Sequence, residues 1–190
     1  KSKVKMSELF IELLSEEIPS SLQKDAREKI KKNIEEGLLR KEIKFTLSKS
    51  YSTPKRLVFY ITGISDKIEH KAKILKGPKV EAPQNAIDGF IKSNKLNKND
   101  IYKKKIEKGE FYFANIKPEK IDVLDELKLI IPDVLQNYSW KKSMKWSDYD
   151  LSWGRPLRSI IALFNKKLIK FNFFHLRSDN FTFIETPKGE

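Results

Sequence analysis

The stretch from Tyr51 to Ile64 constrains the fold of this chain more than any other. Its second half follows Pro54, reaches Gly63 and is rich in β-branched and aromatic residues, which is typical of a β-strand. Alternation along the strand gives one face with Leu57, Phe59 and Ile61 and another with Val58, Tyr60 and Thr62. Because both faces are largely apolar, the pattern predicts a strand near the centre of its sheet.

The turn before this strand carries two cations. Pro54 fixes the approach of the chain, and Lys55 and Arg56 stand where the strand begins, a place where a phosphate group could bind. An ordinary loop with two solvated charges accounts for the same residues without any ligand. Both interpretations stay open on these residues alone.

Hydrophobic periodicity predicts two main amphipathic helices. The first runs from about Ser21 to about Leu38, and Ser20 and Gln23 have the spacing of a capping box at its start. The second carries the apolar positions between Val123 and Leu135. Pro132 lies inside it and is expected to kink it or to begin a fresh turn.

The remaining segments predict strands and one short helix. We expect strands at 8–14, 43–47, 67–76, 101–107, 110–116, 157–164 and 168–174, and the short helix at 85–96. The strand at 43–47 would lead through a long connection into the strand after Arg56. This order predicts an α+β fold with mainly antiparallel sheets built from hairpins. A change of pattern between Lys76 and Pro83 suggests two subdomains, 1–80 and 81–190.

The chain is strongly basic, with 39 Lys and Arg residues against 26 Asp and Glu residues and a formal net charge of +13. Such an excess is compatible with a polyanionic partner, above all nucleic acid. Abundant Lys, Ile and Asn can also reflect an AT-rich genome. The few arginines are therefore the more informative cations, because a guanidinium makes forked contacts that an ammonium cannot.

Lysines also gather on the predicted strands between the two main helices. The positions are Lys71, Lys73, Lys76 and Lys79 on one strand and Lys103, Lys104 and Lys105 on another. Charges on an edge strand resist pairing with other chains, and this role explains the first group as well as phosphate binding does. For Lys103–Lys105 we prefer a solvated strand.

The residues that most enzymes need are missing. The chain has no cysteine, no glycine-rich phosphate loop and no dinucleotide fingerprint, and its two histidines, His70 and His175, stand far apart. A metal site is therefore not expected, and Glu16 and Glu17 are expected to charge the start of a helix or to pair with Arg155 or Arg158. No apolar run approaches the length of a membrane span, and no signal peptide is recognisable, so we expect a cytoplasmic protein without an active site in this chain.

One loop, 141–156, combines aromatic and basic residues. Trp146 and Trp153 offer flat rings, and Lys145, Arg155 and the nearby Arg158 offer cations, a combination that suits single-stranded or looped RNA. The alternative is that both tryptophans fill the core beneath a long loop, and this alternative is preferred for the rings.

Several short motifs, taken together and in order, resemble the β subunit of bacterial two-subunit glycyl-tRNA synthetase. They are ELLSEEIP at 12–19, STPKRL at 52–57, KGP at 76–78, KGE at 108–110, MKW at 144–146 and RP at 155–156. Two departures are that FTFIE follows Ser178 and Asp179-Asn180 where the family has a Gly-His-Arg-Phe step, and that Trp153 stands where Phe is commoner. The resemblance covers the chain up to Ser178.

The resemblance implies the N-terminal part of a longer subunit. In that family the α subunit holds the active site, with ATP, Mg and glycine, while the β subunit supplies binding of tRNA(Gly) in an α2β2 assembly. This region of the family is similar to the body and tail domains of archaeal CCA-adding enzymes. The implied role is to hold tRNA while another polypeptide does the chemistry, with no cofactor in this chain.

The candidate tRNA-binding residues are Lys55, Arg56, Lys145, Trp146, Arg155 and Arg158. Two other hypotheses stay open. In one, the region docks other parts of the synthetase without touching tRNA. In the other, the motif matches are chance and the chain is an unrelated RNA-binding domain.

Overall fold

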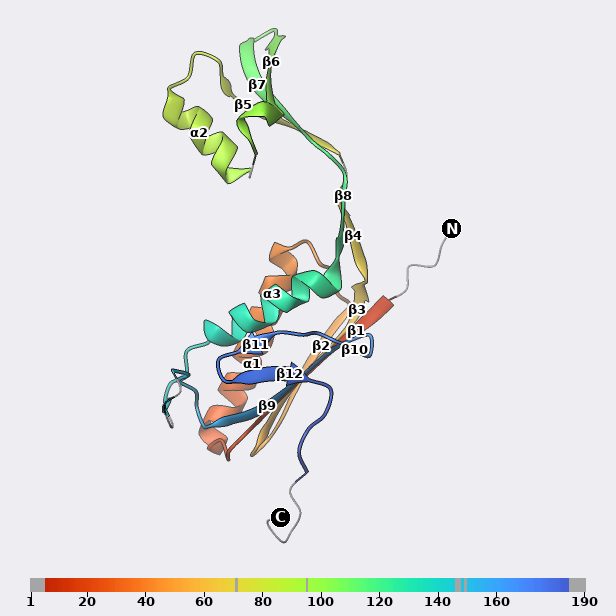
Figure 1. The fold of residues 1–190 in the computed structure, drawn as a ribbon, viewed down its shortest axis with the longest axis vertical. Coiled ribbons are helices and arrows are strands. Elements are labelled where there is room, and N and C mark those ends of the chain that lie inside the picture. Colours follow the sequence, from red (N-terminus) through yellow and green to blue (C-terminus); the bar gives the residue numbers. More distant parts are fainter. Residues whose placement is uncertain (1–5, 71, 95, 146–147, 149, 185–190) are drawn as a thin grey trace. The chain divides into compact units, whose positions relative to one another are not determined.

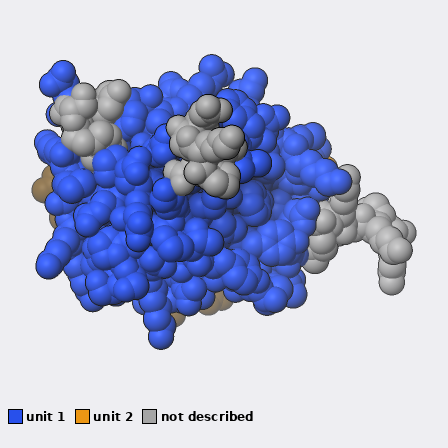
Figure 2. All heavy atoms as spheres, turned by 90° about the horizontal axis from the view of Figure 1, so that it is seen from below, with its two compact units in different colours: residues 1–68, 121–190 blue, residues 69–120 orange. Residues whose placement is uncertain are grey.

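In a computed structural model of the protein, which describes residues 6–70, 72–94, 96–145, 148 and 150–184, the chain forms two units. Unit 1 consists of Lys1–Ile68 with Ile121–Glu190, and unit 2 of Glu69–Lys120. The atoms of unit 1 make one continuous body (Figure 2). The predicted division, 1–80 and 81–190, differs from these units. It assumed that each subdomain is one continuous segment, whereas unit 1 consists of two segments with unit 2 between them in the sequence.

The secondary-structure elements of unit 1 come from both ends of the chain (Figure 1). They are β1 (Met6–Ser15), α1 (Ser20–Arg40), β2 (Leu47–Thr53), β3 (Arg56–Ser65), α3 (Val123–Gln136), β9 (Leu157–Phe164), β10 (Lys167–Leu168), β11 (Asn172–Phe173) and β12 (Leu176–Asp179). Strands β4 (Lys67–His70) and β8 (Glu119–Asp122) pair where the chain passes between the units. Unit 2 contains β5 (Lys73–Lys79), α2 (Gln84–Ser93), the 3₁₀ turn η1 (Lys98–Asp100), β6 (Ile101–Ile106) and β7 (Gly109–Ile116).

The large sheet of unit 1 has the strand order β11-β12-β9-β1-β3-β2, with β10 paired to β9. Strand β1 runs antiparallel to both β3 and β9, whereas β12 runs parallel to β9. The two long helices α1 and α3 lie on the same side of this sheet and share one apolar core with it (Figure 1). The prediction of a mainly antiparallel α+β fold is confirmed.

Strand β3 confirms the main expectation from the sequence. It is an interior strand between β1 and β2, and its side chains Leu57, Phe59 and Ile61 are fully buried on the helix side. The middle of the strand order lies between β9 and β1. The prediction of a long connection before β3 is wrong, because Leu47–Thr53 is itself a strand and only Pro54-Lys55 lies between β2 and β3.

The predicted strand at 43–47 is also wrong, because Ile43 completes the end of helix α1. The amide of Ile43 donates to the carbonyl of Leu38 (2.9 Å) and that of Glu42 to Leu39 (2.9 Å), with Glu42 in the left-handed region at φ 58°. These are the two bonds of a Schellman motif, and the buried contact partners Ile43 and Leu38 complete it. The motif was missed because glutamate stands where glycine is usual.

The start of α1 differs from the predicted capping box. Pro19 holds the N-cap position, and its carbonyl accepts from the amides of Leu22 and Gln23. The side chain of Gln23 donates to the carbonyl of Ile18 (2.8 Å) in place of a reciprocal bond with Ser20. Proline provides no hydroxyl or carboxylate acceptor, so the cap relies on backbone bonds.

Helix α3 follows the prediction closely. The carboxylate of Asp122 accepts from the amide of Leu124 (2.9 Å) and caps the first turn. The helix continues through Pro132 to Gln136 and buries the face that carries Leu127, Ile131 and Val134. Its apolar stripe packs on α1 and the sheet. Among the described residues, no helix is long and apolar enough to cross a membrane.

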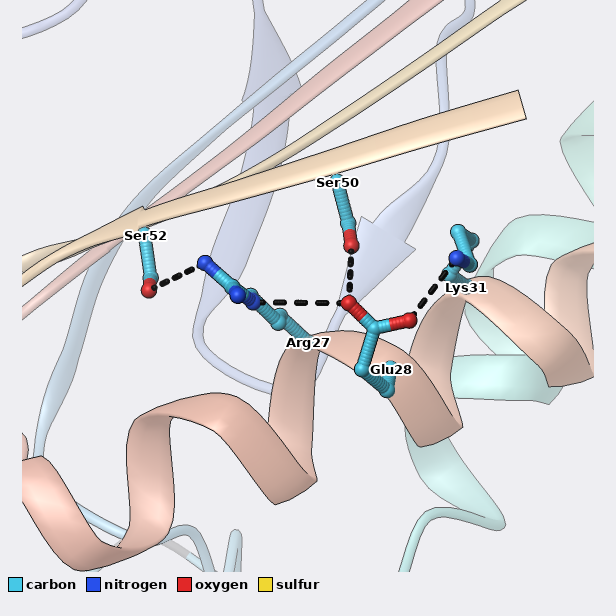
Figure 3. A network of polar contacts seen from close by, with 5 residues as sticks. All are labelled: Arg27, Glu28, Lys31, Ser50 and Ser52. Carbon is cyan, nitrogen blue, oxygen red and sulfur yellow. Dashed lines mark hydrogen bonds and ion pairs between the residues drawn. The ribbon is translucent and has the colours of Figure 1, made fainter. Parts of the chain in front are cut away.

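A polar network ties α1 to strand β2 outside the core (Figure 3). Glu28 accepts from Lys31 (2.8 Å) and from the Ser50 hydroxyl (3.1 Å), and it forms an ion pair with Arg27 (3.4 Å). Arg27 in turn donates to the Ser52 hydroxyl (3.3 Å). The hydrogen bond from Lys31, followed by that from Ser50, lowers the pKa of the Glu28 carboxyl below its ordinary value of 4.5.

The Glu28 network makes stability depend on pH. Because the folded-state pKa lies below the unfolded-state value, the stabilisation is present above the unfolded-state pKa and is lost as the pH falls through the folded-state pKa. Glu28→Gln should therefore flatten the loss of stability below pH 4.5, by about 0.5 kcal/mol or less for this solvent-exposed carboxylate. Urea unfolding at a series of pH values from about 3 to 7, the range in which a Glu carboxyl titrates, measures the effect.

The control is Glu36→Gln, which removes an exposed carboxylate from the same helix, 3.7 Å from Lys32. It should keep the acid slope of the wild-type protein. An equal flattening by both variants would mean that helix charge alone, and no link to β2, sets the slope.

Gly154 should tolerate no side chain. A β-carbon there would lie 2.3 Å from the Trp140 ring, which is itself held in the core. Gly154→Ala should lower the free energy of unfolding by about 1–3 kcal/mol, because the ring has nowhere to move. Urea unfolding followed by tryptophan fluorescence measures this loss.

Gly89 in α2 provides the opposite case, since nothing lies within 4 Å of its added β-carbon. Gly89→Ala should be neutral or should stabilise unit 2 by up to about 1 kcal/mol through helix propensity. If Gly154→Ala were as well tolerated as Gly89→Ala, the packing described around Trp140 would be incorrect.

Candidate nucleic-acid interface

The antiparallel pairing of β1 brings most of the predicted cations to one end of the large sheet. Leu14, near the end of β1, is paired with Arg56 at the start of β3, and Ser15 is paired with Leu157 at the start of β9. The amide of Ser15 donates to the carbonyl of Lys55 (2.9 Å), and that of Glu16 to the carbonyl of Pro156 (2.9 Å). We call the side chains gathered here, Lys55, Arg56, Arg155 and Arg158, the strand-end cluster.

Arg56 is held by bonds inside the protein. Its guanidinium pairs with Glu12 on β1 and donates to the Thr182 hydroxyl (2.7 Å) and to the carbonyl of Phe183. Thr182 also donates to Glu12 (2.6 Å), so the three side chains form a closed triangle. The Arg56 and Glu12 side chains are only 24% and 12% exposed. Arg56 therefore fixes the segment around residue 182 against the sheet.

One signal for this triangle is present in the sequence. Glu12 interrupts the apolar run 9–14, and a carboxylate in such a place needs a partner. The partner follows only from the register of β1 with β3, and Thr182 follows from no local pattern.

Arg158 forms a different kind of pair. Its guanidinium lies 3.5 Å from Glu16, as the sequence suggested for one of the two arginines, and these side chains are 47% and 49% exposed. Such an open pair is screened by solvent and contributes little to stability. Arg155 donates to the carbonyl of Gly154 (3.0 Å), and Lys55 lines a surface hollow with Glu17, Pro54 and other residues of this end.

An isolated β-bridge between Met144 and Trp153 joins two parts of the loop 141–156. The amide of Met144 donates to the carbonyl of Trp153 (2.8 Å), and the amide of Trp153 donates to the carbonyl of Met144 (3.1 Å). Lys145 directly follows Met144, and its side chain is exposed. Trp146 lies outside the described residues. The bridge fixes the backbone of Trp153 two residues before Arg155.

Trp153 is a core residue, as the preferred interpretation of the sequence held. Its ring makes edge contacts with Tyr138, Trp140 and Phe173 at centroid distances of 6.2, 5.2 and 6.0 Å. Burial raises the pKa of the neighbouring Tyr138 to about 12, with a smaller contribution from Asp25. Trp153 therefore anchors the loop and presents no ring to a nucleotide.

Acidic side chains offset most of the positive charge at this end of the sheet. Four cations lie among three carboxylates, Glu12, Glu16 and Glu17, so the local charge is close to balance. Within the described part of the chain, no three His, Asp or Glu side chains lie close enough together to hold a metal ion.

The fold is that of an α+β protein in which basic side chains meet at one end of a mainly antiparallel sheet. The family model described as "Glycyl-tRNA synthetase beta subunit" matches residues 9–187. The chain belongs to this family.

Proteins named "Glycine--tRNA ligase beta subunit" are among the similar relatives. That of Rickettsia peacockii (strain Rustic) is 36% identical over 178 residues, and those of Rickettsia typhi (strain ATCC VR-144 / Wilmington) and Rickettsia bellii (strain OSU 85-389) are each 38% identical over 178 residues. Each alignment covers 94% of this chain and 27% of the relative, so the chain spans about a quarter of the relatives' length. These relatives are subunits of an aminoacyl-tRNA synthetase, and the alternative of an unrelated RNA-binding domain is wrong.

The two ion pairs of the strand-end cluster should differ in strength. Arg56→Met should lower the free energy of unfolding by about 1–3 kcal/mol, because it leaves the half-buried Glu12 without its cation. Adding Glu12→Gln should restore part of the loss. Urea unfolding of the two single variants and the double variant measures the coupling.

The exposed pair supplies the matched control. Arg158→Met and Glu16→Gln should show a coupling of about 0.5 kcal/mol or less. Equal coupling in the two pairs would contradict the assignment of Arg56 to a structural role.

Proposed function

We propose that this chain is a tRNA-binding portion of a glycine–tRNA ligase β subunit and helps to hold tRNA(Gly) while glycine is attached. The observation that carries this proposal is the strand-end cluster, in which cations from two segments far apart in the sequence, 55–56 and 155–158, meet at one end of the sheet. The formal charge of +13 supports a polyanionic partner, and the family name supports a tRNA as that partner.

Within the cluster, Lys55, Arg155 and Arg158 are the proposed phosphate contacts, together with Lys145 on the adjoining loop. The internal bonds described for Arg56 use three of its five N–H groups, so it also remains a candidate. Trp146 is retained as a proposed stacking surface. The backbone bonds at this end of the sheet hold the main chain of the cluster in place, which lowers part of the entropy cost of binding.

The reaction itself is assigned to another polypeptide. We infer an α subunit that binds ATP with Mg and glycine, and an α2β2 assembly in the cytoplasm. The family name supports an α partner, since a β subunit belongs to an assembly of unlike chains.

Docking within the synthetase without contact to tRNA is the second candidate function. The observation that favours it is the exposure of three apolar side chains close together in sequence, Phe181, Phe183 and Ile184. Co-purification with the α subunit tests this candidate. Loss of co-purification in Phe181→Ser and Phe183→Ser variants that still bind tRNA would favour docking as a separate role.

Binding of labelled tRNA(Gly) to the chain, measured by fluorescence anisotropy across a salt series, tests the main proposal. Affinity should fall steeply with salt, because each phosphate contact releases counterions. Lys55→Gln and Arg155→Gln should each make the slope of log K against log salt shallower by about 0.7–0.9. No binding at low salt would overturn the proposal.

The charge-matched control is Lys32→Gln, on the solvent-facing side of α1. It should leave the slope almost unchanged. If it reduces the slope as much as Lys55→Gln does, the chain attracts any polyanion through its net charge. Equal affinity for heparin and tRNA(Gly) would lead to the same conclusion.

A further inference from the structure

Unit 2 has a higher density of positive charge than unit 1. Its segment, 69–120, contains 13 lysines and 7 acidic residues, a formal net charge of +6 within 52 residues. The other 138 residues share the remaining +7 of the total of +13. Net charge per residue in unit 2 is thus about twice that in unit 1.

The sheet of unit 2 has the order β5-β7-β6, and α2 lies to one side of it (Figure 1). A β-carbon added to Gly77 on β5 would lie 2.9 Å from the Phe90 ring of α2. Gly77 shares its face of the strand with Leu75, whose partner Ala114 on β7 is fully buried. Helix α2 therefore covers the face of Leu75, Gly77 and Ala114.

Aromatic side chains occupy the opposite face. Phe111 and Phe113 lie on it from β7, and the pairing register adds Tyr102 from β6, opposite Phe113. The Tyr102 and Phe113 rings are stacked, with centroids 6.1 Å apart and planes 28° from parallel. Ile74 on the same face is 65% exposed, so solvent reaches this face of the sheet.

Lysines surround these rings. Register places Lys76 and Lys104 on the same face, opposite Phe113 and Phe111, and Lys79 opposite Phe111. The Lys76 ammonium lies 3.9 Å from the Phe111 centroid, and those of Lys79 and Lys104 lie 6.0 and 5.9 Å from the Phe111 and Phe113 centroids. Among the described residues, these three lysines form no ion pair. We call this surface, Tyr102, Phe111 and Phe113 with Lys76, Lys79 and Lys104, the aromatic face.

We propose that the aromatic face binds unpaired nucleotides of an RNA, with bases stacked on the aromatic rings and phosphates on the three lysines. Flat rings fit base faces, and base faces are accessible only where the bases are not stacked within a duplex. Uncompensated lysines suit the phosphates between such bases. This assignment deepens the proposed tRNA-binding function and rests on it for the identity of the RNA.

Binding requires the Lys76 ammonium to leave the Phe111 ring. A cation over an exposed ring contributes only about two- to fivefold to an equilibrium. A base stacked on the same ring contributes about five- to hundredfold in affinity. The exchange therefore favours the nucleotide, and the displaced ammonium becomes available to a phosphate.

The experiment uses the whole chain with three labelled probes: a single-stranded RNA 12-mer, the same sequence as a duplex, and tRNA(Gly). The 12-mer should bind more tightly than the duplex. Phe111→Leu keeps an apolar side chain but removes the flat ring, and it should weaken binding of the 12-mer about tenfold. Circular dichroism checks that unit 2 of this variant is folded.

Two exposed lysines on β6 give a matched pair of variants for this experiment, and neither variant changes a core residue. Lys104 lies on the aromatic face, whereas Lys105, paired with Glu110, lies on the opposite face. Lys104→Gln should weaken binding of the 12-mer about fivefold, and Lys105→Gln less than twofold.

The outcomes separate this inference from the function on which it rests. If tRNA(Gly) binds but Phe111→Leu and Lys104→Gln change nothing, the aromatic face is not the site while the proposed function stands. If the 12-mer binds through this face but tRNA(Gly) does not, the proposed function fails and the face keeps its ligand. Equal binding of duplex and 12-mer, or equal effects of Lys104→Gln and Lys105→Gln, overturns the stacking assignment. No RNA binding at all overturns both.

Discussion

The pairing of β1 between β3 and β9 is the constraint on which unit 1 depends. It joins an N-terminal strand to segments about 50 and about 150 residues later, and its apolar side chains Leu9, Ile11 and Leu13 form the floor beneath α1 and α3. Since β1 is antiparallel to both neighbours, its end meets their beginnings. The strand-end cluster and the start of α1 follow from this geometry.

The same geometry separates structural cations from available ones. The Arg56 side chain, at the start of β3, is largely buried and forms an ion pair with Glu12, whereas the ion pair of Arg158 with Glu16 is about half exposed to solvent. Only the exposed members can exchange a carboxylate for a phosphate at low cost, because burial fixes an ion pair through desolvation. In unit 2 the lysines of the aromatic face have aromatic neighbours in place of carboxylates. Each unit therefore offers basic side chains on a rigid sheet.

The sequence predicted elements whose signal is local and periodic. Leu57–Ile64 and the helix around Leu127 follow from alternation and helical spacing. The hairpin of β6 and β7 follows from the turn signal at Lys108-Gly109, although the two turn residues are Glu107 and Lys108. The end of α1 was missed because Glu42 adopts a conformation that glycine usually marks. The return of the chain to unit 1 and the contact of Thr182 with Arg56 depend on distant pairing, which no local pattern encodes. The site residues share this dependence: their types were visible in the sequence, and their meeting at one sheet end was not.

The central claim is that side chains fixed on these sheets bind tRNA. Ultraviolet cross-linking of tRNA(Gly) to the chain, followed by mass spectrometry of the linked peptides, tests it most directly. The account predicts cross-links at Tyr102, Phe111 or Phe113 and in the peptides that contain Lys55 and Arg155. Cross-links confined to the solvent-facing side of α1, or spread evenly over all lysine-rich peptides, would contradict it.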